Sequence, residues 1–284
     1  MTPQEGPSPL TGVHLVALDL DGTLLPSDKQ LTRRAVRVIA EVREAGIDVT
    51  LATGKGWNLT RGYALQLELD APIVSLEGAY VAHATAAGAN TVAAHTVGRA
   101  TRSDIHDHVH DLELGFFYTH TGQRTRLCHR LENRAHQIAV WDPHLDIVDE
   151  PLHAHPEDPF VVHLVGEPER VAEAHTRVLA ADLAGTHLWH APFWDGYHQL
   201  QIRAQGVSKQ AGVAEALQHL DLTASDLLAA GDWMNDVEML RMARVGVSFA
   251  HSPAPVLEAA DIVLNGNSDQ DAIIVFLEDA LARL

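Results

Sequence analysis

Apolar and polar positions alternate along the first part of the chain as the strands and helices of an open α/β sheet require. Short apolar runs at 13–18, 47–52 and 72–76 are separated by segments 31–45 and 59–67, whose apolar residues recur at helical spacing. A period near two predicts a strand, and a period near 3.6 predicts a helix. This β-α-β-α-β order is typical of a parallel sheet with right-handed crossovers.

The same alternation of strand-like and helical segments returns after residue 206. We expect strands at 226–232, 245–249 and 261–264, and helices at 207–220, 235–243, 256–260 and 269–284. The middle of the chain differs, because it is rich in histidine and mixes strand-like and helical pieces. These are strand-like runs at 114–119, 125–129 and 160–165, and helical stretches at 102–111 and 168–183.

The simplest interpretation is an α/β fold, a doubly wound Rossmann-like parallel sheet, with an inserted α+β domain. Residues 1–82 and 199–284 would form the core and residues 83–198 the insertion, with the Gly/Ala-rich stretch 82–90 as the crossing between them. Residues 1–12 are polar and Pro-rich, without the basic and apolar regions of a leader, and are expected to form a flexible tail.

Composition narrows the classes of partner. A formal net charge of −18 opposes binding to nucleic acid or to an anionic membrane surface. No apolar run approaches the length that crosses a bilayer. The single cysteine, Cys128, excludes an internal disulfide and fits a reducing cytoplasm, where we expect a monomer or homodimer.

Two carboxylates mark the end of the first apolar run. Asp19 and Asp21 are one residue apart, so a strand points them in the same direction where the sheet stops. Two like charges this close are unfavourable unless a cation lies between them. The pair therefore predicts a metal-assisted carboxylate site at the carboxyl end of a strand, where open α/β sheets bind their ligands.

Further polar residues follow the other expected strands or begin a helix: Thr53, Lys209, and Asp232 with Asn235 and Asp236. Because parallel strands end at one edge of a sheet, these side chains can converge on the two carboxylates. Together they supply what phosphoryl transfer through an aspartyl-phosphate needs. One carboxylate attacks phosphorus, a second moves the proton, and Mg²⁺, a hydroxyl and an ammonium hold the phosphoryl oxygens.

The motifs resemble those of the haloacid dehalogenase superfamily, in particular the Cof-type phosphatases with a large (class IIB) cap. The four motifs occur in order: Asp-Leu-Asp-Gly-Thr at 19–23, Thr53-Gly54, Gly-Val-Ser-Lys ending at Lys209, and Gly-Asp-Trp-Met-Asn-Asp at 231–236. The resemblance covers nearly the whole chain after the tail, and four ordered motifs are far more specific than one.

The resemblance implies a role for each matching residue. Asp19 would be the nucleophile and Asp21 the general acid/base, while Thr53 and Lys209 would hold the phosphoryl oxygens. Mg²⁺ would be bound by Asp19, Asp232 and the backbone carbonyl of Asp21. Gly54, Asn235 and Asp236 would support this arrangement.

The implied activity is Mg²⁺-dependent hydrolysis of a small phosphomonoester, with a sugar phosphate as first expectation. The inserted domain would be the cap that determines the substrate. A phosphomutase, a nucleotide or cofactor phosphatase, and a non-catalytic binding protein that keeps the fold are the alternatives.

The chain departs from the family pattern at three positions. Lys55 stands where an Arg is usual, and Glu77 replaces the Asn of Asn-Gly-Ala. The strand after the fourth motif leads into Ser-Phe-Ala-His, ending at His251, rather than into Gly-Asn-Ala. We expect Lys55 and Glu77 to form an ion pair that replaces the usual contacts. Candidate substrate contacts are Lys55, Glu77, Arg124, Arg126, Trp194, Tyr197 and His198.

The histidines of the middle segment do not require a metal. His106, His108 and His110 are spaced by two on an expected helix, so only His106 and His110 share a face. A solvated helix face is the favoured interpretation over a metal site, and the same holds for His153 and His155. Cys128 is expected to serve packing.

Overall fold

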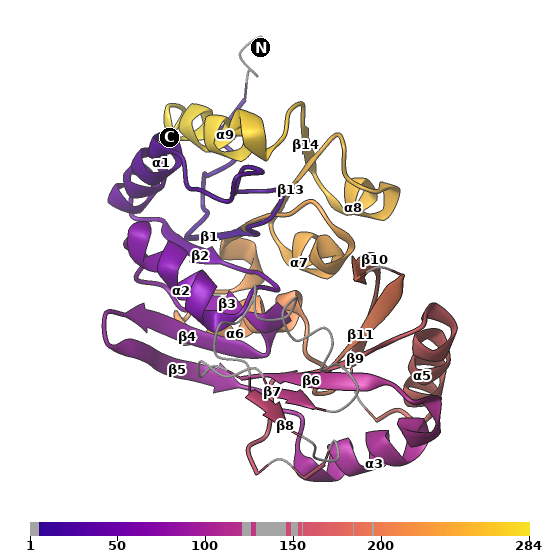
Figure 1. Cartoon of the computed structure of the whole chain (residues 1–284). Helices are drawn as coiled ribbons and strands as arrows, with labels where there is room; N and C mark the ends of the chain where they lie inside the picture. Colours follow the sequence, from indigo (N-terminus) through magenta and orange to yellow (C-terminus); the bar gives the residue numbers. More distant parts are fainter. Residues whose placement is uncertain are drawn as a thin grey trace. The chain divides into compact units, whose positions relative to one another are not determined.

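The computed structural model describes residues 6–120, 126–128, 146–148, 153–154, 156–183, 185–194 and 196–284. The chain separates into two compact units (Figure 1). One contains residues 1–93 and 208–284, and the other contains residues 94–207. In the described part of the chain, no helix is long and apolar enough to span a bilayer.

The first unit is built on a parallel five-stranded sheet in the order β14-β13-β12-β1-β2. Its strands are β1 (Leu15–Leu18), β2 (Asp48–Leu51), β12 (Leu227–Ala230), β13 (Val245–Phe249) and β14 (Ile262–Leu264). All four residues of β1 and of β12 are buried, as expected for central parallel strands covered on both faces. The predicted doubly wound α/β core is confirmed.

Helices lie on both faces of this sheet. They are α1 (Arg33–Glu44), α2 (Trp57–Gln66), α6 (Lys209–His219), α7 (Val237–Met242), α8 (Ala254–Ala259) and α9 (Ala272–Leu281). Helix α1 packs against α9 on one side, and α6 packs against α7 on the other (Figure 1). Thr32 begins α1 and Ser208 begins α6, each by accepting a backbone N–H with its hydroxyl, as N-cap residues do.

A small three-stranded sheet extends the first unit. It consists of β3 (Ile73–Ser75), β4 (Tyr80–Thr85) and β5 (Gly88–Ala94), and a bridge between Ala52 and Val74 joins it to the end of β2. The stretch 82–90 was expected to cross between domains, but it forms β4, a turn and β5 instead. Small Gly and Ala residues therefore mark a tight hairpin here, and the second unit begins at residue 94 rather than 83.

The second unit contains a six-stranded sheet in the order β10-β11-β9-β6-β7-β8, in which only the β7–β8 pair is parallel. Its strands are β6 (Gly115–Thr119), β7 (Arg126–Cys128), β8 (Asp146–Val148), β9 (Val161–Gly166), β10 (Gly185–Trp194) and β11 (Tyr197–Arg203). Helices α3 (Arg99–Val109) and α5 (Pro168–Ala180) supply apolar residues to its core. The inserted α+β architecture is thus present.

Two local features differ from the sequence expectations. Part of the expected tail is packed, because Leu10 is 1% exposed and the Ser8 hydroxyl donates to the carbonyl of Ala280 at 2.6 Å. Strand β10 was not expected, since Pro192 interrupts its pattern. Proline is tolerated there because β10 is an edge strand whose pairing shifts register between Trp189 and Trp194.

Candidate active site

The candidate site lies at the carboxyl edge of the parallel sheet, where β1, β2 and β12 end. Asp19 directly follows β1, Thr53 follows β2 and Asp232 follows β12, while Lys209 is the first residue of α6. The parallel register of these strands brings residues more than 200 positions apart to one edge. Asp19, Lys209 and Asp232 therefore meet at one edge of the sheet, as the sequence predicted.

A buried ammonium joins two of the carboxylates. Lys209 Nζ donates to Asp19 Oδ1 at 2.6 Å and to Asp236 Oδ1 at 2.7 Å. Burial alone lowers the pKa of Lys209, but the two carboxylates outweigh it and raise the pKa, so the ammonium stays protonated. Asp236 Oδ2 accepts the backbone N–H groups of Asp232 and Trp233, both at 3.0 Å. Asp236 thus contacts Lys209 with one oxygen and the Asp232 loop with the other.

Asp232 is less enclosed and faces the loop of the first motif. Its Oδ1 accepts from the Thr23 hydroxyl at 3.2 Å. Gly22 has a φ of +83°, and a Cβ at this position would lie 2.3 Å from Asp232 Oδ2. Glycine is required here both by the left-handed backbone and by the close approach of the carboxylate.

The three carboxylates fit a hard divalent cation. Asp19, Asp232 and Asp236 each offer an oxygen, and these atoms all lie within 4.8 Å of one another. Burial raises the pKa of Asp19 well above its usual value, with Lys209 opposing and Asp236 and Asp232 adding to the rise. Burial and Asp236 likewise raise the pKa of Asp232. A cation would relieve this crowding, and an all-oxygen set suits Mg²⁺.

The Asp21 carboxylate is directed to a different set of partners. Its Oδ1 lies 2.8 Å from Lys29 Nζ and its Oδ2 lies 2.5 Å from Lys55 Nζ. Burial works to raise the pKa of Asp21, but hydrogen bonds from Lys29 and Lys55 lower it. The side chain of Asp21 therefore does not join the three-carboxylate cluster, which agrees with a role for its backbone carbonyl rather than its carboxylate in metal binding.

The expected ion pair between Lys55 and Glu77 is replaced by other contacts. Lys55 pairs with Asp21, whereas Glu77 accepts from Asn235 Nδ2, at 2.8 Å to Oε1 and 3.0 Å to Oε2. Leu76 and Glu77 have φ values of 53° and 60°, and this rarely adopted backbone turns the Glu77 side chain inward. Gly54 leaves room for it, because a Cβ there would lie 2.3 Å from Glu77 Oε1.

Thr53 is buried beside this group. Its Oγ1 accepts the backbone N–H of Lys55 at 3.2 Å, and its own carbonyl accepts the N–H of Glu77 at 3.0 Å. Sequence reasoning missed Lys29 and Thr23. One signal was available for the lysine: the chain has only three lysines, Lys29, Lys55 and Lys209, and all three lie on the motif carboxylates.

The other candidate substrate contacts belong to the second unit. Arg126 is in β7, Trp194 in β10, and Tyr197 and His198 in β11, while Arg124 lies outside the described residues. These four described positions share one sheet. Their contact with a substrate stays a prediction.

The histidine-rich helix is α3. His106 lies against His110 and His153, with ring centroids 5.8 Å and 5.2 Å apart. His108 instead contacts the carbonyl of Asp104 in its own helix. His155 lies outside the described residues, and the carboxylate cluster around Asp19 is the one group of three metal-ligating side chains found in the described part of the chain.

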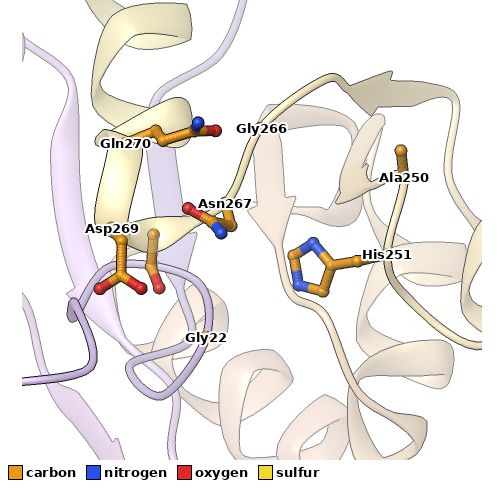
Figure 2. Close-up of a pocket in the computed structure, with 8 residues that line it drawn as sticks. Gly22, Ala250, His251, Gly266, Asn267, Asp269 and Gln270 are labelled. Carbon is orange, nitrogen blue, oxygen red and sulfur yellow. The ribbon is translucent and has the colours of Figure 1, made fainter.

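A pocket of about 520 Å³ adjoins the motif loops (Figure 2). Its walls are Gly22, the loop after β13 with Ala250 and His251, and the loop after β14 at 266–270. His251 Nε2 lies 3.9 Å from Asp232 Oδ2. The third departure from the family pattern is therefore next to the carboxylate cluster.

Comparisons with known proteins show the family of the chain. Residues 16–277 match the haloacid dehalogenase-like hydrolase family. A 5-amino-6-(5-phospho-D-ribitylamino)uracil phosphatase of Bacillus subtilis is 25% identical over 288 residues, covering 95% of this chain and 98% of the relative. A pyridoxal phosphate phosphatase of Escherichia coli is 26% identical over 281 residues, covering 93% and 97%.

Solved structures show the same fold. A haloacid dehalogenase-like hydrolase from Bacteroides thetaiotaomicron superposes with a TM-score of 0.76 at 20% identity, covering 94% of this chain and 98% of the other. A subclass IIB sugar phosphatase of the superfamily gives 0.74 at 16% identity, with the same coverage. The chain therefore belongs to the haloacid dehalogenase-like hydrolases and is a phosphatase of the Cof type, a phosphoric monoester hydrolase.

Proposed function

We propose that this protein dephosphorylates a small phosphorylated metabolite, with a sugar phosphate as the preferred substrate, through an aspartyl-phosphate on Asp19. The observation that carries the proposal is the arrangement of Asp19, Lys209 and Asp232 at the end of the sheet, with Lys209 Nζ 2.6 Å from Asp19 Oδ1. A buried carboxylate beside an ammonium and a cation site is what nucleophilic attack on a phosphate ester needs.

In the first step, an Asp19 oxygen forms a bond to phosphorus while the bond to the ester oxygen breaks. Asp21, whose side chain is 44% exposed, donates the proton that this leaving oxygen takes up. Asp21 then accepts a proton from a water molecule as the water oxygen attacks phosphorus. The bond from phosphorus to Asp19 breaks, which releases phosphate and regenerates the carboxylate.

The remaining residues hold this geometry. Lys209 and Thr53 would contact the phosphoryl oxygens, and Asp236 fixes Lys209 through its 2.7 Å contact. Asn235 and Gly54 would support them. Asp19, Asp232 and the backbone carbonyl of Asp21 would hold Mg²⁺, which supplies the positive charge that offsets the repulsion between carboxylates and phosphate. We further propose that residues 94–207 act as the cap that selects the substrate.

Two relatives support this range of substrates. The Bacillus subtilis relative is a 5-amino-6-(5-phospho-D-ribitylamino)uracil phosphatase, and the phospho-D-ribityl group of that name favours a sugar-like leaving group. The relative at 26% identity acts on pyridoxal phosphate, so a cofactor phosphatase is the second candidate. We place the activity in the cytoplasm, which the single cysteine fits, with the protein as a monomer or homodimer.

Phosphate release from a panel of sugar, nucleotide and cofactor phosphomonoesters tests the proposal. We expect turnover with Mg²⁺, loss of turnover in excess EDTA and recovery when Mg²⁺ is restored. Highest kcat/KM for a sugar phosphate supports the preferred class, and highest kcat/KM for pyridoxal phosphate supports the second. No Mg²⁺-dependent release from any ester would refute the proposal.

A further inference from the structure

We propose that His251 supplies an imidazole nitrogen to the divalent cation of the carboxylate cluster, and that this makes the centre prefer Mn²⁺ or Co²⁺ more strongly than oxygen ligands alone would. The inference rests on the proposed function only in requiring that the cluster of Asp19 and Asp232 binds a cation.

His251 lies beside the carboxylate cluster. Its Nε2 lies 3.9 Å from Asp232 Oδ2, the oxygen that faces Gly22. The ring projects from the loop after β13 into the pocket beside the Gly22 loop (Figure 2). Its side chain is 46% exposed, so it can adjust without disturbing the core.

The spacing is compatible with one shared ion. Ligand atoms about 2.1 Å from a single cation lie about 3 Å apart when adjacent and about 4.2 Å apart when opposite. At 3.9 Å, Nε2 and Oδ2 lie between these two distances and too far apart for a direct hydrogen bond, so a small rotation of the exposed ring brings Nε2 to the spacing of adjacent ligands.

The type of donor atom then decides which divalent cation the centre prefers. Mg²⁺ favours oxygen ligands and keeps several waters, while Mn²⁺ and above all Co²⁺ accept imidazole nitrogen more readily. Asp19 and Asp232 alone would offer only oxygen. Since the loop after β13 carries His251 in place of the Gly-Asn-Ala pattern, a nitrogen donor at this position is a feature of this chain's own sequence.

The ring of His251 is bounded on one side by an aromatic residue of β13. Phe249 is tilted against the His251 ring at 5.5 Å between centroids and limits its orientation. Phe249 is fully buried, so this wall is fixed. Nε2 is the ring nitrogen that lies 3.9 Å from Asp232 Oδ2, so it is the nitrogen that would serve as the ligand.

Electron spin-echo spectroscopy of the Mn²⁺-loaded protein tests the proposal directly, because a bound imidazole gives ¹⁴N modulation. We expect this modulation in the wild type and its loss in His251→Asn. Calorimetric titration should show that the ratio of Mn²⁺ to Mg²⁺ affinity falls about tenfold in the same variant. His14→Asn, at an exposed histidine paired with Asp226, is the matched control and should keep both signals.

The possible results separate the two proposals. Mn²⁺ bound by the wild type without ¹⁴N modulation, or an unchanged affinity ratio in His251→Asn, would overturn the role of His251 and leave the phosphatase proposal standing. If neither the wild type nor Asp232→Asn binds any divalent cation in the titration, the metal centre does not exist. That result would overturn both proposals.

Discussion

Only Leu20 separates Asp19 from Asp21, yet their carboxylates have opposite surroundings. Asp19 is buried against Lys209 and two further carboxylates, and its pKa is raised mainly by burial. Asp21 is half-exposed between Lys29 and Lys55, which lower its pKa against the effect of burial. Burial thus opposes the charged form of Asp19, which a bound cation and Lys209 would favour, whereas Lys29 and Lys55 favour the charged form of Asp21, the form that accepts a proton from water.

The first prediction concerns the nucleophile. Asp19→Asn keeps the shape of the side chain and its contact with Lys209 but removes the attacking oxygen's charge. We expect kcat to fall by at least about a thousandfold, while the melting temperature stays within a few degrees of wild type. Phosphate release and thermal unfolding measure the two effects. Retention of wild-type turnover would exclude Asp19 as the nucleophile.

The second prediction compares two glycines that have the same left-handed backbone conformation. Gly22 and Gly46 have φ values of +83° and +81°, so alanine at either costs about 1–2 kcal/mol of stability. Only at Gly22 does a Cβ meet a neighbour, Asp232 Oδ2 at 2.3 Å, whereas Gly46 has nothing within 4 Å. Gly22→Ala should therefore also raise the Mg²⁺ concentration for half-maximal activity about tenfold.

Gly46→Ala is the control for that experiment. It should lose similar stability in urea unfolding and keep the Mg²⁺ dependence of wild type. Equal Mg²⁺ dependence in both variants would show that the approach of Asp232 to Gly22 has no part in metal binding.

At the scale of single elements, strand β9 carries a buried polar residue where apolar ones are usual. His163 stacks on Phe117 of β6 with ring centroids 4.1 Å apart, and its Nε2 lies 2.8 Å from the Thr119 hydroxyl. Burial, together with Arg203, lowers the pKa of His163 to about 3. The strand thus holds a neutral imidazole whose Nε2 contacts the Thr119 hydroxyl and whose Nδ1 contacts the side-chain amide of Gln199.

The free energy of unfolding should therefore decrease as the pH falls. Below its unfolded pKa of about 6.5, His163 takes up a proton only in the unfolded chain, so its contribution to stability is lost as pH falls toward 3. Between pH 7 and pH 5 the free energy of unfolding should fall by about 2 kcal/mol from this group. Urea unfolding of wild type and His163→Gln at both pH values should show a smaller fall in the variant. An equal fall would place the effect elsewhere.

At the scale of the whole molecule, a net charge of −18 surrounds a site that must bind an anion. The three lysines offset this only locally, since each already lies against a carboxylate. Long-range repulsion should therefore slow the encounter with a phosphate ester, and salt should screen it.

The corresponding prediction is a rise of kcat/KM with ionic strength. Raising KCl from about 10 mM to 150 mM shortens the screening length from about 30 Å to about 8 Å, so we expect kcat/KM to rise about twofold. Initial rates at low substrate measure it, and kcat at saturating substrate should change little. A fall in kcat/KM with salt would mean that Lys29, Lys55 and the bound cation dominate the field that the substrate meets.

The sequence by itself determined the class of fold, the family and the main motif residues. Hydrophobic periodicity and short motifs are local properties, and the ends of parallel strands must share an edge. Asp19, Lys209 and Asp232 could therefore be placed together in advance. The extent of the inserted unit could not, because a hairpin and a crossing segment share the small residues of 82–90.

Only the tertiary structure decided which partner each remaining charge takes. Lys55 meets Asp21, Glu77 meets Asn235, and His251 approaches Asp232. Each pair joins loops that are separate in sequence, and the direction of Glu77 depends on a left-handed backbone that its residue type does not favour. Such contacts follow from how loops pack on the finished sheet, so no local pattern in the chain contains them.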